Sequence, residues 1–244
     1  MRGCFVTGTD TGAGKTAVAA AVAAALRARG ERVVARKPVL TGTDEATDPD
    51  WGPDDQLLAA VAGDDAGAVA PVRFGPPVSP HLAAALAGTR IEPRALVGCV
   101  RAAAAAADAV VVEGVGGALV PLDDGYAVRD LAADLGLPVI VAARPGLGTI
   151  NHSLLTLEAL RSSGLEVAGV VLTPWPPEPS VIERSNRETI ARLGGVEVAT
   201  LPRLARPRRL LLAAAGAGLP LDRWLEGAGY QRPSALACAS STPK

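Results

Sequence analysis

The segment "VTGTDTGAGKTAVAAAVAAALRARG", residues 6–30, constrains the fold of this chain more than any other stretch. A β-branched run, "GCFVTG", leads into a turn containing Gly8, Gly12 and Gly14, and an Ala/Val-rich helix is predicted to begin at Lys15. The pattern G-x-x-x-x-G-K-[ST], which binds phosphate groups, requires a glycine where this chain has Thr9. The other parts of such a loop are present, and an ordinary glycine-rich turn from strand to helix is the simpler alternative.

A loop of this kind predicts a nucleotide site. Its backbone N–H groups and the helix N-terminus would face the β-phosphate, because both carry partial positive charge. Lys15 would reach the β- and γ-phosphate oxygens, and the Thr16 hydroxyl could hold Mg²⁺.

Composition indicates a soluble cytoplasmic protein. The 244 residues suit one α/β domain, and the net charge of −1 offers no basic field for nucleic acid or an anionic membrane. Cys4, Cys99 and Cys238 are too scattered for a disulfide framework or a zinc site. The N-terminus has no signal-peptide pattern, and the longest apolar stretch contains charged residues, which argues against a membrane span.

Strand-like and helix-like segments alternate along the chain, which predicts a doubly wound, mainly parallel sheet with helices on both faces. Nearly continuous Val/Ile/Ala runs predict strands at 4–8, 32–38, 108–114, 137–143, 166–173 and 196–202. Helices are expected at 15–29, 54–62, 80–87, 93–106, 128–135, 151–163 and 179–193. We expect one domain over residues 1–228 and a loosely ordered tail over 229–244, where Gly, Pro and Ser accumulate. The polar segment 41–55 is the expected active-site loop.

Three further charged residues are candidates for the nucleotide site. Glu113 ends an apolar strand and precedes glycines, where a second metal ligand is expected, although a solvated charge at a strand end is the alternative. Lys37 ends the second strand and could either bind a substrate anion or reach solvent. Asp54 could be a metal ligand or a helix N-cap, and the sequence does not separate it from Asp55.

In order and with similar spacing, the motifs of residues 3–202 resemble those of the dethiobiotin synthetase family, a family of P-loop NTPase type. They are "VTGTDTGAGKT", "KPVLTG", "SPH", "VEGVGG" followed by "LVPL", and "LGTINHSLLTLEAL". The resemblance implies an ATP- and Mg²⁺-dependent ligase of biotin biosynthesis that joins CO₂ to 7,8-diaminononanoate. It also implies a carbamate intermediate, a carbamic–phosphoric anhydride, and a homodimer whose active sites are shared between subunits.

The resemblance also implies residue roles. Lys37, Lys15 and Thr11 would be catalytic, and Thr16, Asp54 and Glu113 would hold Mg²⁺. The nucleotide-binding residues would be Gly12, Ala13, Gly14, Lys15, Thr16 and Ala17. The substrate would be bound by Thr41, Gly116 and Gly117, together with a loop from the other subunit consisting of Leu147, Gly148, Thr149, Ile150 and Asn151.

Two positions depart from the family pattern. Better-known members have Glu where this chain has Gly12, and some have an adenine-contacting Asn where it has Thr173. We therefore expect several nucleoside triphosphates to be used. A switch ATPase of the ParA/MinD type is the alternative function, but those proteins carry a signature lysine where this chain has Asp10.

Overall fold

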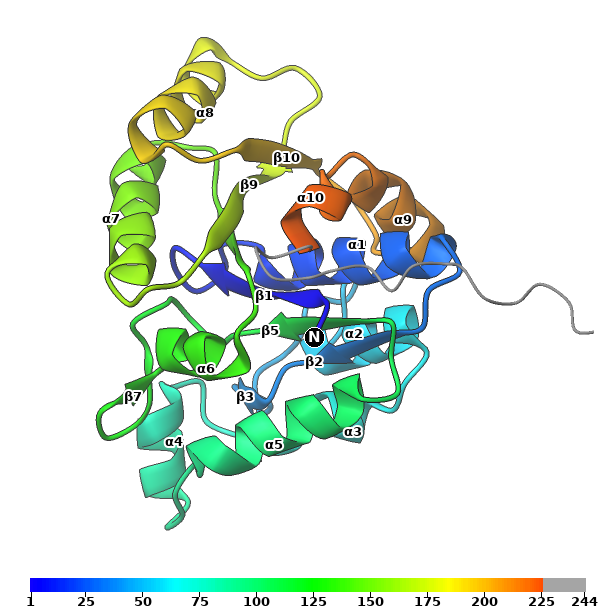
Figure 1. The fold of residues 1–244 in the computed structure, drawn as a ribbon, viewed down its shortest axis with the longest axis vertical. Coiled ribbons are helices and arrows are strands. Elements are labelled where there is room, and N and C mark those ends of the chain that lie inside the picture. Colours follow the sequence, from blue (N-terminus) through cyan, green and yellow to red (C-terminus); the bar gives the residue numbers. More distant parts are fainter. Residues whose placement is uncertain (226–244) are drawn as a thin grey trace, which may run out of the picture.

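The computed structural model describes residues 1–225, so the tail expected over 229–244 lies outside the described residues. A six-stranded sheet forms the centre, with strand order β10-β9-β8-β1-β5-β2 and every neighbouring pair parallel (Figure 1). Its strands are β1 (Gly3–Gly8), β2 (Val33–Arg36), β5 (Ala109–Glu113), β8 (Val139–Ala143), β9 (Val167–Trp175) and β10 (Val198–Pro202). The predicted doubly wound parallel sheet is confirmed.

Successive side chains of each strand enter different cores, as the two-residue period of a strand requires. In β1, Cys4 and Val6 pack in one core and Phe5 packs in the other. In β8, Ile140 joins the first core and Val141 the second. Burial on both faces explains why these strands read as continuous apolar runs.

Helices cover both faces of the sheet, as the sequence predicts. The first core is covered by α1 (Lys15–Ala28), α2 (Asp54–Ala62), α9 (Arg209–Ala217) and α10 (Leu221–Leu225). The second is covered by α5 (Pro93–Ala104), α6 (Val128–Leu135), α7 (Thr149–Arg161) and α8 (Val181–Gly194). Figure 1 shows α9 alongside α1, with α5 and α6 on the other side of the sheet. No helix within residues 1–225 combines the length and apolarity needed to cross a lipid bilayer.

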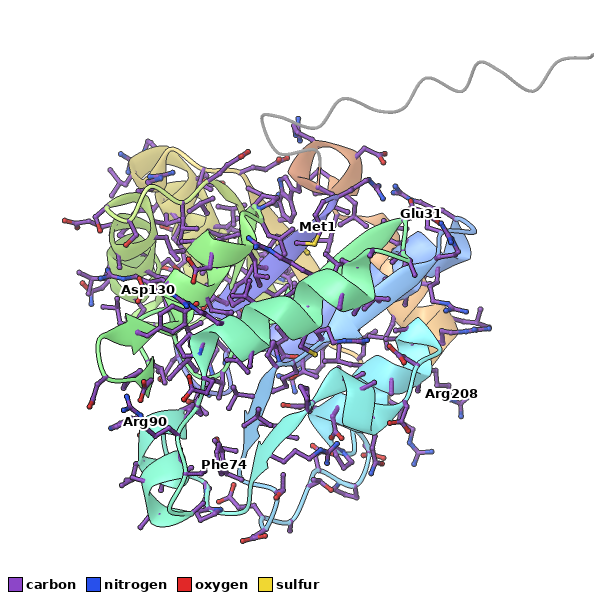
Figure 2. The ribbon with its side chains drawn as sticks, turned by 60° about the horizontal axis from the view of Figure 1, so that its bottom comes forward. Met1, Glu31, Phe74, Arg90, Asp130 and Arg208 are labelled. Carbon is purple, nitrogen blue, oxygen red and sulfur yellow. The ribbon has the colours of Figure 1, made fainter. Side chains whose placement is uncertain are left out.

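Several short elements were not predicted. β3 (Val39–Thr41) and β4 (Val72–Phe74) form a parallel pair, and β6 (Pro121–Asp123) and β7 (Tyr126–Ala127) form an antiparallel one. The short helix α3 (Ala66–Val69) was not predicted either, whereas α4 (Pro80–Leu86) matches the helix predicted at 80–87. Phe74 lies beside α4 and packs in the second core with Ala83 and Ala84 (Figure 2). Only Lys37 and Pro38 separate β3 from the end of β2 in the main sheet.

Helix α1 is buried around most of its circumference. Its buried residues run without interruption from Val18 to Leu26, and most of them are alanine. Helix α9 approaches so closely that a Cβ atom on Gly216 would overlap the carbonyl oxygen of Ala21. Small residues on both helices permit this crossing, which fixes the direction of α1 and hence the position of its first residues.

Candidate active site

The candidate residues converge because the parallel strands end at one edge of the sheet. Strand β1 ends at Gly8 and leads into the glycine-rich loop, and β5 ends at Glu113. Lys37 directly follows β2, which pairs with β5. The expected convergence of Lys15, Lys37 and Glu113 at this edge is therefore observed.

The glycine-rich loop has the backbone expected of a phosphate-binding turn. Gly12 and Gly14 have φ values of 69° and 92°, in the left-handed region that favours glycine. Gly14 caps α1, and the Lys15 Nζ donates to the carbonyl oxygen of Asp10 at 3.1 Å. The Lys15 ammonium thus folds back over the loop into which a phosphate would fit. Gly14 also lies against Thr173, so a Cβ there would overlap its methyl group.

The Lys37 cluster is defined here as Lys15, Thr16, Lys37, Asp54 and Glu113: the last four are joined by side-chain hydrogen bonds, and Lys15 interacts with them through its charge. The Lys37 Nζ donates to Glu113 Oε1 at 2.7 Å and also to Asp54. The Thr16 hydroxyl donates to the same Glu113 oxygen at 2.9 Å. Lys37 and Glu113 are buried, with 4% and 1% of their surfaces exposed. The alternatives of a solvent-exposed Lys37 and a solvated Glu113 are therefore wrong.

Burial and charge together set the pKa values in the Lys37 cluster. Burial lowers the pKa of Lys15 below its ordinary value. Burial also acts downward on Lys37, but the carboxylates of Glu113 and Asp54 outweigh it and raise the pKa. Burial raises the pKa of Glu113, whereas Lys37 outweighs burial at Asp54 and lowers its pKa. Lys37 is therefore a permanent cation, and any further cation would stabilise the ionised form of Glu113.

Asp54 and Asp55 are separated by their partners, although both begin α2. Asp54 faces Lys37, with its side chain 39% exposed. Asp55 is 1% exposed and pairs instead with Arg73, the middle residue of β4. Neither accepts a local N-cap hydrogen bond, since the cap position is Pro53 and α2 has no side-chain cap.

The Lys37 cluster fits Mg²⁺. The second carboxylate oxygen of Glu113 is buried and has no hydrogen-bond partner in the described part of the chain. Asp54 and the Thr16 hydroxyl add oxygen atoms beside it, and oxygen ligands are those Mg²⁺ prefers. Mg²⁺ usually takes only one or two protein carboxylates and completes its shell with phosphate and water. Residues 1–225 contain no group of three or more His, Cys, Asp or Glu side chains suited to a metal.

The other predicted residues border the Lys37 cluster to different degrees. Thr11 is exposed in the glycine-rich loop, while Ala13 is buried and Ala17 is half-buried. Gly117 lies next to that loop, since a Cβ on it would be 3.5 Å from the carbonyl oxygen of Gly8. Gly116, with φ 62°, belongs to the same turn, and Thr41 ends β3 half-buried. None of these side chains donates or accepts a side-chain hydrogen bond with the Lys37 cluster in residues 1–225.

The segment from Leu147 to Asn151 lies at the end of β8 and forms the start of α7. Gly148 caps the helix with φ 89°, and Thr149 is buried with a hydroxyl that has no hydrogen-bond partner in the region described. Leu147 is 99% exposed, and Asn151 is exposed as well. Within residues 1–225, no side-chain hydrogen bond or ion pair joins these residues to the Lys37 cluster.

Two residues near the site were missed from the sequence. Arg144, directly after β8, donates from Nε to the carbonyl oxygen of Gly12 at 3.1 Å. Asn186 of α8 is buried and donates to the carbonyl oxygens of Pro145 and Gly146. No motif contains either residue, but Arg144 shares with Lys37 its place immediately after an apolar strand. That shared position was the available signal.

Comparisons with known proteins agree on one family. A family model described as an AAA domain matches residues 2–206. ATP-dependent dethiobiotin synthetase BioD of Anaeromyxobacter dehalogenans (strain 2CP-1) is 46% identical over 224 residues, covering 89% of this chain and 98% of that protein. The protein of the same name from Mycobacterium sp. (strain KMS) is 44% identical over 198 residues, covering 80% and 85%.

A solved structure of a ParA family ATPase from Chlorobium tepidum TLS covers 88% of this chain and 88% of its own. It has a TM-score of 0.51 and 14% sequence identity, so the likeness concerns the fold alone. The predicted P-loop NTPase fold is confirmed by these comparisons.

Proposed function

Because this chain belongs to the ATP-dependent dethiobiotin synthetase family, we propose that it forms dethiobiotin from 7,8-diaminononanoate and CO₂ through a carbamate and a carbamic–phosphoric anhydride. It is an ATP-dependent ligase of biotin biosynthesis. One observation supports the detailed proposal most strongly. Lys15 and Lys37 bring two cations to the same end of the sheet, where a carbamate and a γ-phosphate would have to meet.

The proposed chemistry has three steps. One amine of the substrate attacks the carbon of CO₂ and loses a proton, which gives a carbamate anion. A carbamate oxygen then attacks the γ-phosphorus, the bond to the β-phosphate oxygen breaks, and ADP leaves. The second amine attacks the carbonyl carbon, the C–O bond to phosphate breaks, and loss of a proton completes the ureido ring.

The second step brings two anions together, so the residues that carry positive charge contribute most there. Lys15 would give up its hydrogen bond to the Asp10 carbonyl for phosphate oxygens. The Lys37 ammonium has three N–H donors, of which Asp54 and Glu113 accept two, and the third remains for the carbamate. The hydroxyl groups of Thr11 and Thr41 would also contact the amine substrate or its carbamate.

Thr16, Asp54 and Glu113 would hold Mg²⁺, and the bound ion would supply positive charge to the β- and γ-phosphate oxygens. The residues from Gly12 to Ala17 would bind the nucleotide phosphates, chiefly through backbone N–H groups. Gly116 and Gly117 would line the same site through their backbone, because their lack of a side chain lets a ligand approach closely.

We also propose that the active enzyme is a homodimer in which α7 of one subunit completes the site of the other. The exposure of Leu147 and Asn151 supports this, because these side chains are available to a second subunit. The N-terminus of α7 would receive the substrate carboxylate. Mixing inactive Lys37→Met subunits with inactive Asn151→Ala subunits should restore part of the activity, because one site of the mixed dimer would be intact. No recovery on mixing would contradict shared sites.

The direct test of function is incubation of the full chain with Mg·ATP, ¹³C-labelled bicarbonate and 7,8-diaminononanoate. Dethiobiotin carrying the label in its ureido carbonyl should appear in the mass spectrum, together with ADP and phosphate in equal amounts. Omitting ATP should abolish the product. A folded protein that yields ADP without labelled dethiobiotin would refute the proposed substrate while leaving ATP use intact.

A further inference from the structure

The guanidinium of Arg144 lies against the phosphate-binding loop, and the proposed mechanism gives it no role. Its Nε donates to the Gly12 carbonyl oxygen at 3.1 Å, and its Nη2 donates to the Thr11 carbonyl oxygen at 3.4 Å. The side chain therefore crosses from the end of β8 to the loop that follows β1. Arg144 forms no ion pair in residues 1–225, so its charge is not cancelled by a neighbouring carboxylate.

Gly12 leaves the space that the Arg144 guanidinium occupies. A Cβ built on Gly12 would lie 2.7 Å from Arg144 Nη2, closer than two such atoms can approach. A side chain at this position would therefore require the guanidinium to shift away from the loop. Gly12 also has a φ of 69°, which adds a second reason for glycine there.

The chain segment that carries Arg144 is itself fixed. The buried Asn186 of α8 donates from Nδ2 to the Pro145 carbonyl oxygen at 3.0 Å and to the Gly146 carbonyl oxygen at 3.2 Å. The residues immediately after Arg144 are thus tied to a helix of the second core. A side chain extending from an anchored backbone can hold a mobile partner in one geometry.

We propose that Arg144 is a positioning residue for nucleotide binding, which fixes the Thr11 and Gly12 peptide groups through their carbonyl oxygens. In a trans peptide group the C=O and N–H bonds point in opposite directions. Holding the carbonyls of Thr11 and Gly12 toward Arg144 therefore turns the N–H groups of Gly12 and Ala13 to the other side, where phosphate oxygens can accept from them. The inference requires only that the loop binds ATP, and it stands whether or not the amine substrate is the one proposed above.

The first test measures Mg·ATP binding to the full-length Arg144→Ala protein by titration calorimetry. Loss of two charge-assisted hydrogen bonds should raise Kd by about fivefold to thirtyfold. Arg144→Lys should recover part of this loss, since an ammonium can still donate to one carbonyl.

The matched control is Arg101→Ala. Arg101 is also exposed and donates to a backbone carbonyl, that of Asp134 at 2.7 Å, but it lies near Met1 and Arg2 at the start of β1. This variant should bind Mg·ATP as the unmodified protein does. An Arg144→Ala protein whose Kd also stays within about twofold of the unmodified value would overturn the proposal.

The second test uses Gly12→Ala, alone and combined with Arg144→Ala. Because the new methyl group displaces the guanidinium, the double variant should bind Mg·ATP as weakly as Gly12→Ala alone. If Arg144→Ala instead weakened binding by its full factor in both backgrounds, the glycine would not be making room for the arginine. Thermal unfolding of each variant confirms that binding is compared between folded proteins.

Discussion

Replacing Lys37 by methionine should destabilise the fold as well as abolish turnover. Methionine keeps most of the volume but removes the cation between Asp54 and Glu113, and the Glu113 side chain is fully buried. Leaving a buried charge without its partner costs about 3–5 kcal/mol. Glu113→Gln should cost less, about 1–3 kcal/mol, because Lys37 keeps its pairing with Asp54.

The double variant Lys37→Met/Glu113→Gln separates charge from packing. With both charges of the buried pair removed, its loss of unfolding free energy should fall short of the summed single losses by about 1–3 kcal/mol. Equilibrium unfolding in urea measures this quantity. With a slope of about 2–3 kcal/mol per molar, Lys37→Met alone should lower the midpoint by about 1–2 M.

Arg36→Met is the matched control, since Arg36 is the adjacent residue and nearly as buried. Its partner Asp64 has a side chain that is 28% exposed, so water can solvate the carboxylate once the arginine is gone. The expected loss is below about 2 kcal/mol. The reasoning fails if Lys37→Met costs no more than this control, or if the two single changes in the pair are simply additive.

Three further outcomes are expected. Asp54→Asn should weaken Mg²⁺-dependent ATP binding with little change in Tm. Asp55→Asn should instead lower Tm by several degrees and leave the Mg²⁺ dependence intact, because Asp55 pairs with Arg73. Calorimetry of both variants tests this difference. GTP and CTP should support turnover with kcat/KM within about tenfold of that for ATP, and a preference for ATP above about a hundredfold in a competition assay would contradict it. Burial raises the pKa of the Cys4 thiol to about 12 from an ordinary 9.0, so its thiolate is scarce at neutral pH. Iodoacetamide should therefore alkylate the less buried Cys99 well before Cys4, which peptide mass mapping measures. Equal labelling rates would refute this. The raised pKa of Cys4 also makes the free energy of unfolding depend on pH. Its contribution is complete below pH 9.0 and is lost as the pH rises toward about 12, because the Cys4 thiol ionises more readily in the unfolded chain over this range.

The sheet edge that carries the site could be predicted, because the sequence pattern indicates parallel strands and parallel strands all end at one edge. Lys37 and Glu113 each follow or end a continuous apolar run, and parallel strands end on the same side. The choice between Asp54 and Asp55 could not be predicted. Successive helical residues point about 100° apart, and only the placement of Lys37 and Arg73 around α2 decides which carboxylate faces the site.

The elements that were missed are those whose structure depends on distant contacts. Strands β3 and β4 have three residues each, too few to show a period. Helix α9, "RLLLAAAGA", has no polar face and contains Gly216, so its sequence alone gives weak evidence for a helix. Packing against α1 stabilises it, as tertiary contacts stabilise most helices in proteins. Arg144 was missed for a similar reason, because its partners Thr11 and Gly12 are remote in sequence.

The burial of α1 fixes the positions of the two side chains at its start. Lys15 and Thr16 begin α1, which packs against the sheet, α2 and α9. These two side chains therefore cannot change position unless the first core repacks. The loops after β9 and β10 are more exposed at the same edge, so a substitution there disturbs less packing. Substitutions in these segments should therefore leave the positions of Lys15 and Thr16 unchanged.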